Sequence, residues 1–129
     1  MEKRMFTNFV NGRLAEGGNA VAIQEIPWNE HKDFKGVFLK NVVTPEHTNA
    51  LFTCHLVRIE PGMCIGMHTH PTSIELHEVI AGEGKCLTEQ GEIQYAPGQI
   101  AVLPENSPHE VRAGKDGLCL FAKLVMIPG

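Results

Sequence analysis

The sequence lacks several features that would place it in common classes of protein. No apolar run approaches the about 20 residues that a membrane-spanning helix needs. The formal net charge is −4, and the chain has no basic stripe of the kind that nucleic-acid binding requires. The N-terminal residues, MEKRMFTNFVNGR, have a basic start but neither the apolar stretch nor the cleavage site of a secretory signal. We therefore expect a cytoplasmic protein that binds neither nucleic acid nor membranes.

Paired cysteines are also missing. A zinc ribbon needs two closely spaced cysteine pairs, and the spacing in this chain excludes one. In a reducing compartment the simplest expectation is free thiols that are largely buried. The four cysteines are Cys54, Cys64, Cys86 and Cys119.

The sequence does contain a series of short apolar runs separated by turn signals. Its 129 residues suffice for one domain with a core of its own. Short strands at this spacing predict a β-sandwich or barrel, and no segment keeps an amphipathic helical period over three turns. Breaks between strands are predicted at Pro- and Gly-containing segments, including residues 82–84 and 114–117. The predicted strands occupy residues 37–43, 51–59, 65–70, 74–81, 85–89, 94–96, 100–103, 109–113 and 118–127.

The polar N-terminal part differs from the remainder of the chain. Residues 1–35 contain glycine pairs and a charged connector, which predicts an arm or peripheral strands. Residues 36–129 carry the recurring strands, which predicts the barrel itself. We see no linker that would separate a second domain, so we expect a single structural domain overall.

Three histidines and one glutamate form the most informative pattern. His68 and His70 are two residues apart, so on a strand both rings leave the same face. A short turn over residues 71–73 can bring Glu75 alongside them, and His109 follows downstream. Imidazole and carboxylate are ligands that divalent transition metals accept. The sequence therefore predicts a metal site with these four residues as ligands.

The segment from Gly62 to Gly82 resembles the first motif of the cupins, G(X)5HXH(X)3–4E(X)6G. The residues that fill this motif without a gap are Gly62, His68, His70, Glu75 and Gly82.

A second segment resembles the second cupin motif, G(X)5PXG(X)2H(X)3N. Gly98, Pro104 and His109 match it, whereas Asn106 replaces the second glycine and Ala113 the final asparagine. Neither departure affects a predicted ligand. Asparagine tolerates a left-handed backbone better than most residues, so Asn106 can keep the same turn.

The resemblance covers about residues 37–126 and implies a small single-domain metal-binding barrel of the cupin 2 kind. Its fold would be all-β, a double-stranded β-helix or jelly roll with an N-terminal arm. Small cupins are commonly dimers. Leu76 and Ile80 are apolar on what should be the outer face of the motif strand, which also indicates a homodimer or a covering arm.

The predicted ligand set leaves coordination positions open on an octahedral ion. Such an ion can hold a bidentate substrate, polarise a carbonyl or present a site to dioxygen. Iron or manganese is favoured, and nickel, cobalt or zinc remains possible. We predict a small metal-dependent enzyme, an oxygenase, isomerase or lyase, that acts on a small polar chelating substrate. The alternative is a non-catalytic module that binds or senses a sugar or an organic acid, and a purely structural site ranks last.

Other residues near the motifs have open roles. His77 shares strand parity with Glu75 and should face the barrel interior, where it is our candidate catalytic acid or base. The alternative is a cavity-lining histidine that is hydrogen-bonded to a neighbour. His55 could face either the cavity or the dimer surface, and Arg58 is more often a surface residue in such a position. Cys64 would face the metal site only if its strand ran unbroken.

Tyr95 lies just before a predicted turn at residues 96–98. We expect it to be a packing residue.

Overall fold

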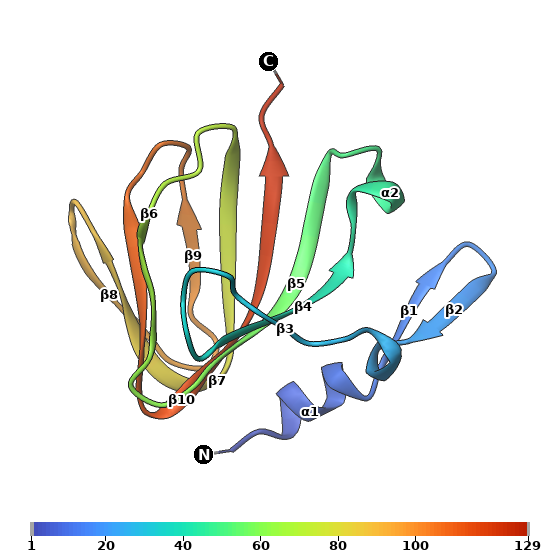
Figure 1. Cartoon of the computed structure of the whole chain (residues 1–129), viewed down its shortest axis with the longest axis horizontal. Coiled ribbons are helices and arrows are strands. Elements are labelled where there is room, and N and C mark those ends of the chain that lie inside the picture. Colours follow the sequence, from blue (N-terminus) through green and yellow to red (C-terminus); the bar gives the residue numbers. More distant parts are fainter. Residues whose placement is uncertain (1, 129) are drawn as a thin grey trace.

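Antiparallel strands make up most of the molecule, as the sequence predicts (Figure 1). The structure, a computed structural model, describes residues 2–128. Its elements are α1 (Arg4–Val10), β1 (Arg13–Glu16), β2 (Asn19–Ala22), the 3-10 turn η1 (Ile23–Glu25), β3 (Asn29–Glu30), β4 (Val37–Val43), α2 (Pro45–Thr48), β5 (Phe52–Ile59), β6 (Cys64–His68), β7 (Ser73–Thr88), β8 (Gly91–Tyr95), β9 (Ile100–Leu103) and β10 (His109–Met126).

Two long strands, β7 and β10, hold the barrel together. The main sheet has the order β3-β4-β5-β10-β7-β8, while β6 pairs with β10 and β9 with β7. One end of the β7–β10 pair lies between β5 and β9, and its other end lies between β6 and β8. Both walls of the jelly roll therefore contain parts of the same two strands (Figure 1).

The strand breaks predicted at residues 82–84 and 114–117 are wrong. β7 and β10 run through these glycine-containing segments without interruption. The two strands approach closely here, since a Cβ on Gly84 would lie only 2.1 Å from the Arg112 carbonyl oxygen. The pairing register shifts in the same region. The glycines thus let the paired strands bend from one wall into the other and do not end them.

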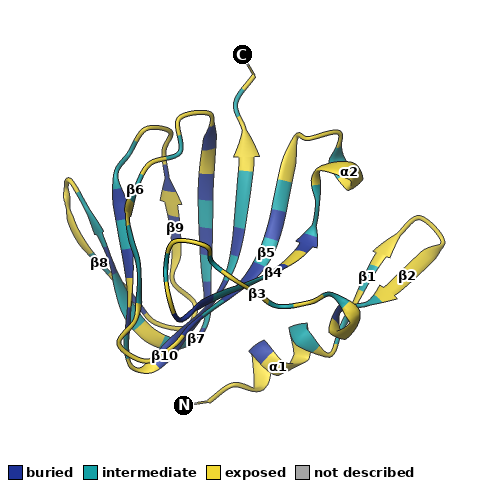
Figure 2. Cartoon of the chain, viewed as in Figure 1, coloured by how far each residue is buried: buried dark blue, intermediate teal, exposed yellow. Residues whose placement is uncertain are grey.

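The barrel interior holds the main hydrophobic core. Side chains alternate along each strand, so every second residue of β5, β7 and β10 points inward. Figure 2 shows buried stretches on the barrel strands and exposed residues on the β1–β2 hairpin. The fully buried side chains of this core include Val37, Ile59, Tyr95, Leu118 and Leu120.

The N-terminal arm packs on the outside of the barrel. Phe6 of α1 and Ile23 of η1 are buried in a second hydrophobic cluster with Leu56 and Cys119 on the outer face of the sheet. The buried Lys40 ammonium of β4 donates hydrogen bonds to two carbonyl oxygens of the arm, at 3.0 and 2.8 Å. The arm includes a short helix, which the sequence did not predict, because seven residues are too few to show a helical period.

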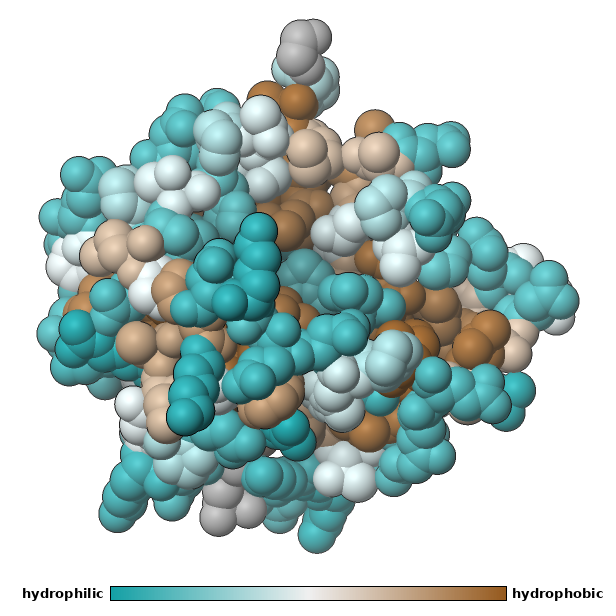
Figure 3. All heavy atoms as spheres, in the orientation of Figure 1, coloured by the Kyte–Doolittle hydropathy of each residue, from teal (hydrophilic) through white to brown (hydrophobic). Residues whose placement is uncertain are grey.

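Over residues 2–128, no helix has both the length and the apolar character needed to cross a membrane. Hydrophilic residues cover most of the face shown in Figure 3, and some hydrophobic residues are visible at the surface near its centre.

Candidate metal centre

The structure brings the four predicted ligand residues together inside the barrel. His68 comes from the end of β6, His70 from the loop after it, Glu75 from β7 and His109 from the start of β10. One nitrogen or oxygen atom of each residue lies within 4.8 Å of the corresponding atoms of the other three. Glu75 and His109 are buried, whereas the other two histidines are partly accessible. The cluster therefore has one buried side and one side nearer to solvent, and it suits a divalent metal ion.

Backbone carbonyls orient two of the histidine rings. His68 Nδ1 lies 2.7 Å from the Gly66 carbonyl oxygen, and His109 Nδ1 lies 3.0 Å from that of Ser107. A carbonyl only accepts hydrogen bonds, so each Nδ1 carries the proton that it donates. Each Nε2 is then the nitrogen presented to the cluster, which is the arrangement that a metal-binding histidine needs.

The turn before His109 has the backbone conformation that the second motif requires. Asn106 adopts a φ of 58°, in the left-handed region, so the expectation that asparagine can replace the motif glycine is confirmed. Its backbone N–H donates a hydrogen bond to the His70 carbonyl oxygen at 3.0 Å. This bond ties the loop that carries His70 to the loop that precedes His109.

Glu75 is the electrostatic centre of the cluster. Burial alone would raise the pKa of its carboxyl group, but the interactions with His109, His70 and His77 outweigh burial and hold that pKa well below its ordinary value. Glu75 is therefore ionised. Burial in turn lowers the pKa of His109, but its hydrogen bonds to Glu75 and to the Ser107 carbonyl, together with the charge of Glu75, outweigh burial, and the net shift is upward. A metal ion would take the place of the proton between these two side chains.

His70 supplies the clearest indication that the cluster fits a metal. Its Nε2 is buried and makes no hydrogen bond within the described part of the chain, although it lies 3.4 Å from Glu75 Oε1. A buried polar nitrogen without a partner costs free energy that a bound ligand can offset. Three imidazole nitrogens and one carboxylate would satisfy a divalent transition metal.

His77 lies beside the cluster and not within it. It faces the barrel interior next to Glu75, as strand parity predicts, and its exposed fraction is 2%. Its Nε2 lies 3.2 Å from Glu75 Oε2, and its Nδ1 lies 2.8 Å from the Tyr95 hydroxyl. Both ring nitrogens therefore have partners. Sequence reasoning missed Tyr95, which packs in the core as expected but also contacts this histidine.

Cys86 is the other polar neighbour of Tyr95. Burial raises the pKa of the Tyr95 hydroxyl, and the hydrogen bond to Cys86 adds to the shift. Burial likewise raises the pKa of the Cys86 thiol. Both groups therefore stay protonated near neutral pH.

His55 points into the barrel, which resolves one of the open alternatives. It pairs with Ala122 of β10, and Ala122 pairs in turn with His77, so the two histidines flank a small residue on the inner face. Burial lowers the pKa of His55, with smaller effects from Glu75 and the neighbouring histidines. A hollow of about 240 Å³ adjoins it; the lining residues are Asn41, Val43, Thr44, Pro45, Thr53 and His55.

Cys64 does not face the cluster. The pairing of β6 with β10 is irregular, with one extra β6 residue within the range 65–68. This bulge reverses strand parity, so Cys64 pairs with the exposed Arg112 while Ile65 packs against the barrel core. The condition for Cys64 to line the site, an unbroken strand, is not met.

Arg58 lies outside the barrel, as expected. Its guanidinium group stacks over the rings of Trp28, at 5.1 Å, and Phe38, at 4.7 Å. Through Trp28 it therefore helps to hold the N-terminal arm against the sheet, and it does not line the metal cluster.

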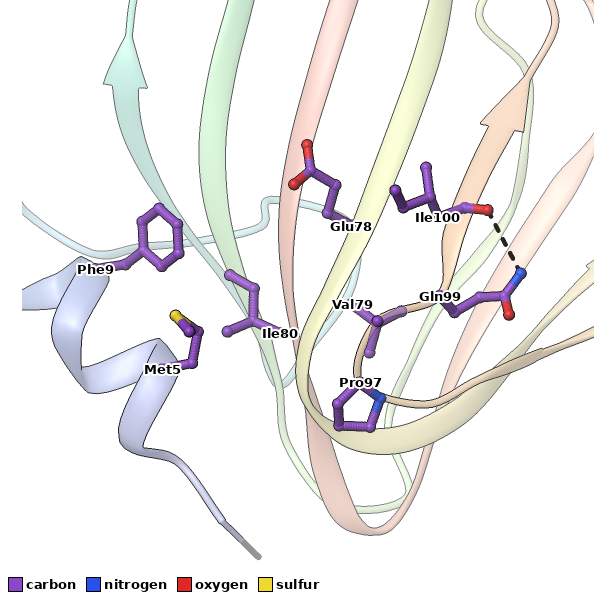
Figure 4. A pocket seen from close by; sticks show the side chains of 9 residues that line it. Met5, Phe9, Glu78, Val79, Ile80, Pro97, Gln99 and Ile100 are labelled. Atoms are coloured by element: carbon purple, nitrogen blue, oxygen red, sulfur yellow. Dashed lines mark hydrogen bonds between the residues drawn. The ribbon is translucent and has the colours of Figure 1, made fainter.

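A larger hollow, of about 430 Å³, lies on the opposite face of β7 from the metal cluster (Figure 4). Met5 and Phe9 of α1 border it on one side, and Pro97 and Ile100 border it on the other. Its lining is mainly apolar and contributes nothing to the cluster of histidines. The arm and the outer face of the sheet thus leave a gap between them.

Comparison with known proteins is consistent with this architecture. A protein-family model described as the cupin domain matches residues 55–127. No curated protein sequence matches the chain.

Several solved structures resemble the fold. A predicted oxalate decarboxylase from Thermotoga maritima is 18% identical, with 83% of this chain and 98% of that chain covered and a TM-score of 0.76. The polyketide cyclase RemF from Streptomyces resistomycificus is 16% identical. The match covers 84% of this chain and 78% of that chain, with a TM-score of 0.72. Ectoine synthase from P. lautus is 17% identical. The match covers 84% of this chain and 78% of that chain, with a TM-score of 0.71. Identities this low concern the fold alone.

Proposed function

The chain belongs to the cupin domain family, and we propose that it is a small metal-dependent enzyme, an oxygenase, isomerase or lyase, that acts on a small polar chelating substrate. The observation that carries this proposal is the convergence of four potential ligand atoms within 4.8 Å inside the barrel. Proteins described as a synthase and a cyclase share the fold, which supports an enzymatic role without identifying the reaction.

His68, His70, Glu75 and His109 would hold the ion, for which we favour iron or manganese, with nickel, cobalt and zinc as further candidates. When bound, the ion would supply a Lewis acid with open positions for a chelating substrate. The protein contributes one negative charge from Glu75 and orients His68 and His109 through backbone carbonyls. Partial accessibility of His68 and His70 gives the open side from which a substrate would approach.

The hollow beside His55 is an argument for a substrate that is small and polar. Asn41 and Thr53 offer hydrogen-bonding side chains there, and the lowered pKa of His55, caused mainly by burial, favours its neutral form. A neutral imidazole both donates and accepts hydrogen bonds, which suits hydroxyl or carbonyl groups. The acid–base role that we predict for His77 stays a prediction. Both of its ring nitrogens contact protein groups, the Tyr95 hydroxyl and the Glu75 carboxylate.

The test is elemental analysis of protein purified anaerobically without added metal, followed by activity assays on a panel of small chelating compounds with dioxygen uptake recorded. We expect stoichiometric metal and turnover that is lost in His70→Ala with the fold retained. His47→Ala is the matched control, because His47 is an exposed histidine of α2. Turnover without metal, or no metal even after reconstitution, would overturn the proposal.

The same panel separates the enzyme from the alternative, a module that binds or senses a sugar or an organic acid. A compound that raises the melting temperature of the metal-loaded protein but is recovered unchanged would favour the module. A compound that is converted would favour the enzyme.

We further propose that the protein is a cytoplasmic homodimer. Its four cysteines are free thiols, which supports a reducing compartment. The outer face of β7 and β9 carries apolar side chains that remain exposed: Ile74 at 38%, Ile100 at 59% and Val102 at 60%. The ion pair between Lys123 and Glu78 lies among them, so the face carries both signs of charge and can be self-complementary about a two-fold axis. A second copy of this chain is the occupant that we propose for it.

A further inference from the structure

The two oxygens of the Glu75 carboxylate have different neighbours. Oε1 faces the cluster, 3.1 Å from His109 Nε2 and 3.4 Å from His70 Nε2. Oε2 lies 3.2 Å from His77 Nε2. A carboxylate can rotate about its last bond, so a partner on Oε2 determines where Oε1 points.

Hydrogen-bond chemistry gives the direction of each bond around His77. An ionised carboxylate only accepts, so the 3.2 Å contact between His77 Nε2 and Glu75 Oε2 requires the proton to be on Nε2. In the neutral ring Nδ1 is then an acceptor, and the Tyr95 hydroxyl 2.8 Å away is its donor. The three side chains form one directed chain, from the Tyr95 hydroxyl through the His77 ring to the Glu75 carboxylate.

All three side chains are buried, so the loss of either contact would be costly in free energy. The exposed fractions of Glu75, His77 and Tyr95 are 8%, 2% and 1%. Water can hardly replace a missing partner in such a place, so loss of either bond would leave a buried polar group unpaired. The rings of His77 and Tyr95 also meet edge to face, at an interplanar angle of 87°, which limits rotation of the imidazole.

We propose that Tyr95 and His77 are positioning residues that hold Glu75 in the orientation needed to bind the metal. Tyr95 selects the protonation pattern of the His77 ring, and His77 fixes the carboxylate so that Oε1 faces the ligand histidines. Partners of this kind behind a metal ligand typically change metal affinity by about 10- to 100-fold when removed. This inference rests on the proposed metal-dependent function.

The test is a titration of the metal-free protein with Co(II), in which affinity is measured by chelator competition and the site by its visible absorption bands. The variants are Tyr95→Phe, which removes only the hydroxyl group, His77→Phe and the double variant. Cys86→Ala is the matched control, because Cys86 contacts Tyr95 without joining the chain to Glu75. Melting temperatures of the metal-free proteins report the fold.

We expect Tyr95→Phe to weaken Co(II) binding about tenfold and His77→Phe up to about 100-fold. Because Tyr95 acts through His77, the double variant should bind no more weakly than His77→Phe alone. The absorption bands should shift in Tyr95→Phe and stay unchanged in Cys86→Ala, which a purely structural effect would not produce. If His77→Phe does not fold, the Co(II) affinity and the absorption spectrum of Tyr95→Phe alone test the proposal.

Two failures are distinguishable. Wild-type protein that does not bind Co(II) would overturn the metal-dependent function and this inference with it. Wild-type binding that Tyr95→Phe leaves unchanged, in affinity and in spectrum, would overturn the inference alone. Additive losses in the double variant would likewise show that Tyr95 does not act through His77.

Discussion

The two faces of β7 carry different chemistry although their residues alternate along one strand. Glu75 and His77 point inward, are nearly inaccessible, and each polar atom lies near a partner. Leu76 and Glu78 point outward and remain half-buried, with Glu78 paired to Lys123 near solvent. A carboxylate that is paired near solvent contributes little to stability or function, whereas a buried one depends on every neighbour.

This difference indicates that the positions of individual polar atoms matter on the inner face of β7 and much less on its outer face. On the inner face three histidines contact one carboxylate, and the outer face has apolar side chains that need only be covered. Substitutions on the inner face should therefore alter metal binding specifically. Substitutions on the outer face should alter assembly or overall stability and leave the metal site intact.

The largest effect should come from Glu75→Gln. The change removes the negative charge of the ligand cluster while preserving the size of the side chain, so metal affinity should fall more than the about 100-fold expected for a group behind a ligand. Isothermal titration with Mn(II) or Co(II) measures the loss. Glu78→Gln, three residues along and on the outer face, should bind metal as the wild type does; equal losses in the two variants would refute the contrast between the faces.

The next effect concerns the outer face alone. Val102→Lys places a charge in the proposed contact between two copies, and an unpaired buried charge costs several kcal/mol. Sedimentation should then show half the wild-type mass, with metal affinity unchanged. A wild-type protein that sediments as a monomer would refute the dimer, and Gln90→Lys in the exposed turn between β7 and β8 is the control for one added charge.

Ile80→Ala should have a smaller effect, confined to stability. Ile80 packs against the cluster that joins the arm to the barrel and is only half-buried, so we expect a loss of about 2 kcal/mol, at the low end for such truncations. Urea unfolding of the metal-free protein measures it. A drop in metal affinity of more than a few-fold would show that the arm influences the inner face.

The smallest effect is a pH dependence of metal stabilisation. The pKa of His109 is raised in the folded metal-free protein, chiefly by Glu75 against the opposing effect of burial. The stability that this proton contributes is present below the unfolded pKa of about 6.5 and is lost as pH rises through the folded pKa. Metal must displace the proton, so the increase in melting temperature caused by Mn(II) should be larger at pH 8 than at pH 6. Equal increases would contradict a protonated His109.

Much of the site could be predicted because its signals are local. The spacing of His68, His70 and Glu75 identifies candidate ligands within eight consecutive residues, and strand parity places His77 beside Glu75. The tolerance of asparagine for a left-handed backbone likewise preserves the turn at Asn106. Each of these inferences needs only the chemistry of neighbouring residues.

The remainder depends on how distant strands meet. Tyr95 reaches His77 only because β8 folds back on the far end of the curved β7, and the residues are 18 positions apart. The bulge in β6 that turns Cys64 outward leaves no clear mark in the sequence other than a glycine. Glycines at 82–84 and 114–117 look like turns in sequence, but tertiary pairing uses them for bends.

The continuity of β7 and β10 has a consequence for how the molecule opens. Since both strands belong to both walls, neither wall can separate without breaking hydrogen bonds of the other. Amide protons along these strands should exchange with solvent through global unfolding and report a common free energy of opening, whereas those of β1 and β2, paired only with each other, should exchange early. The candidate ligands Glu75 and His109 lie on the slow strands, whereas His68 and His70 lie on the accessible side of the cluster, so a bound ion should exchange through that side without unfolding of the barrel.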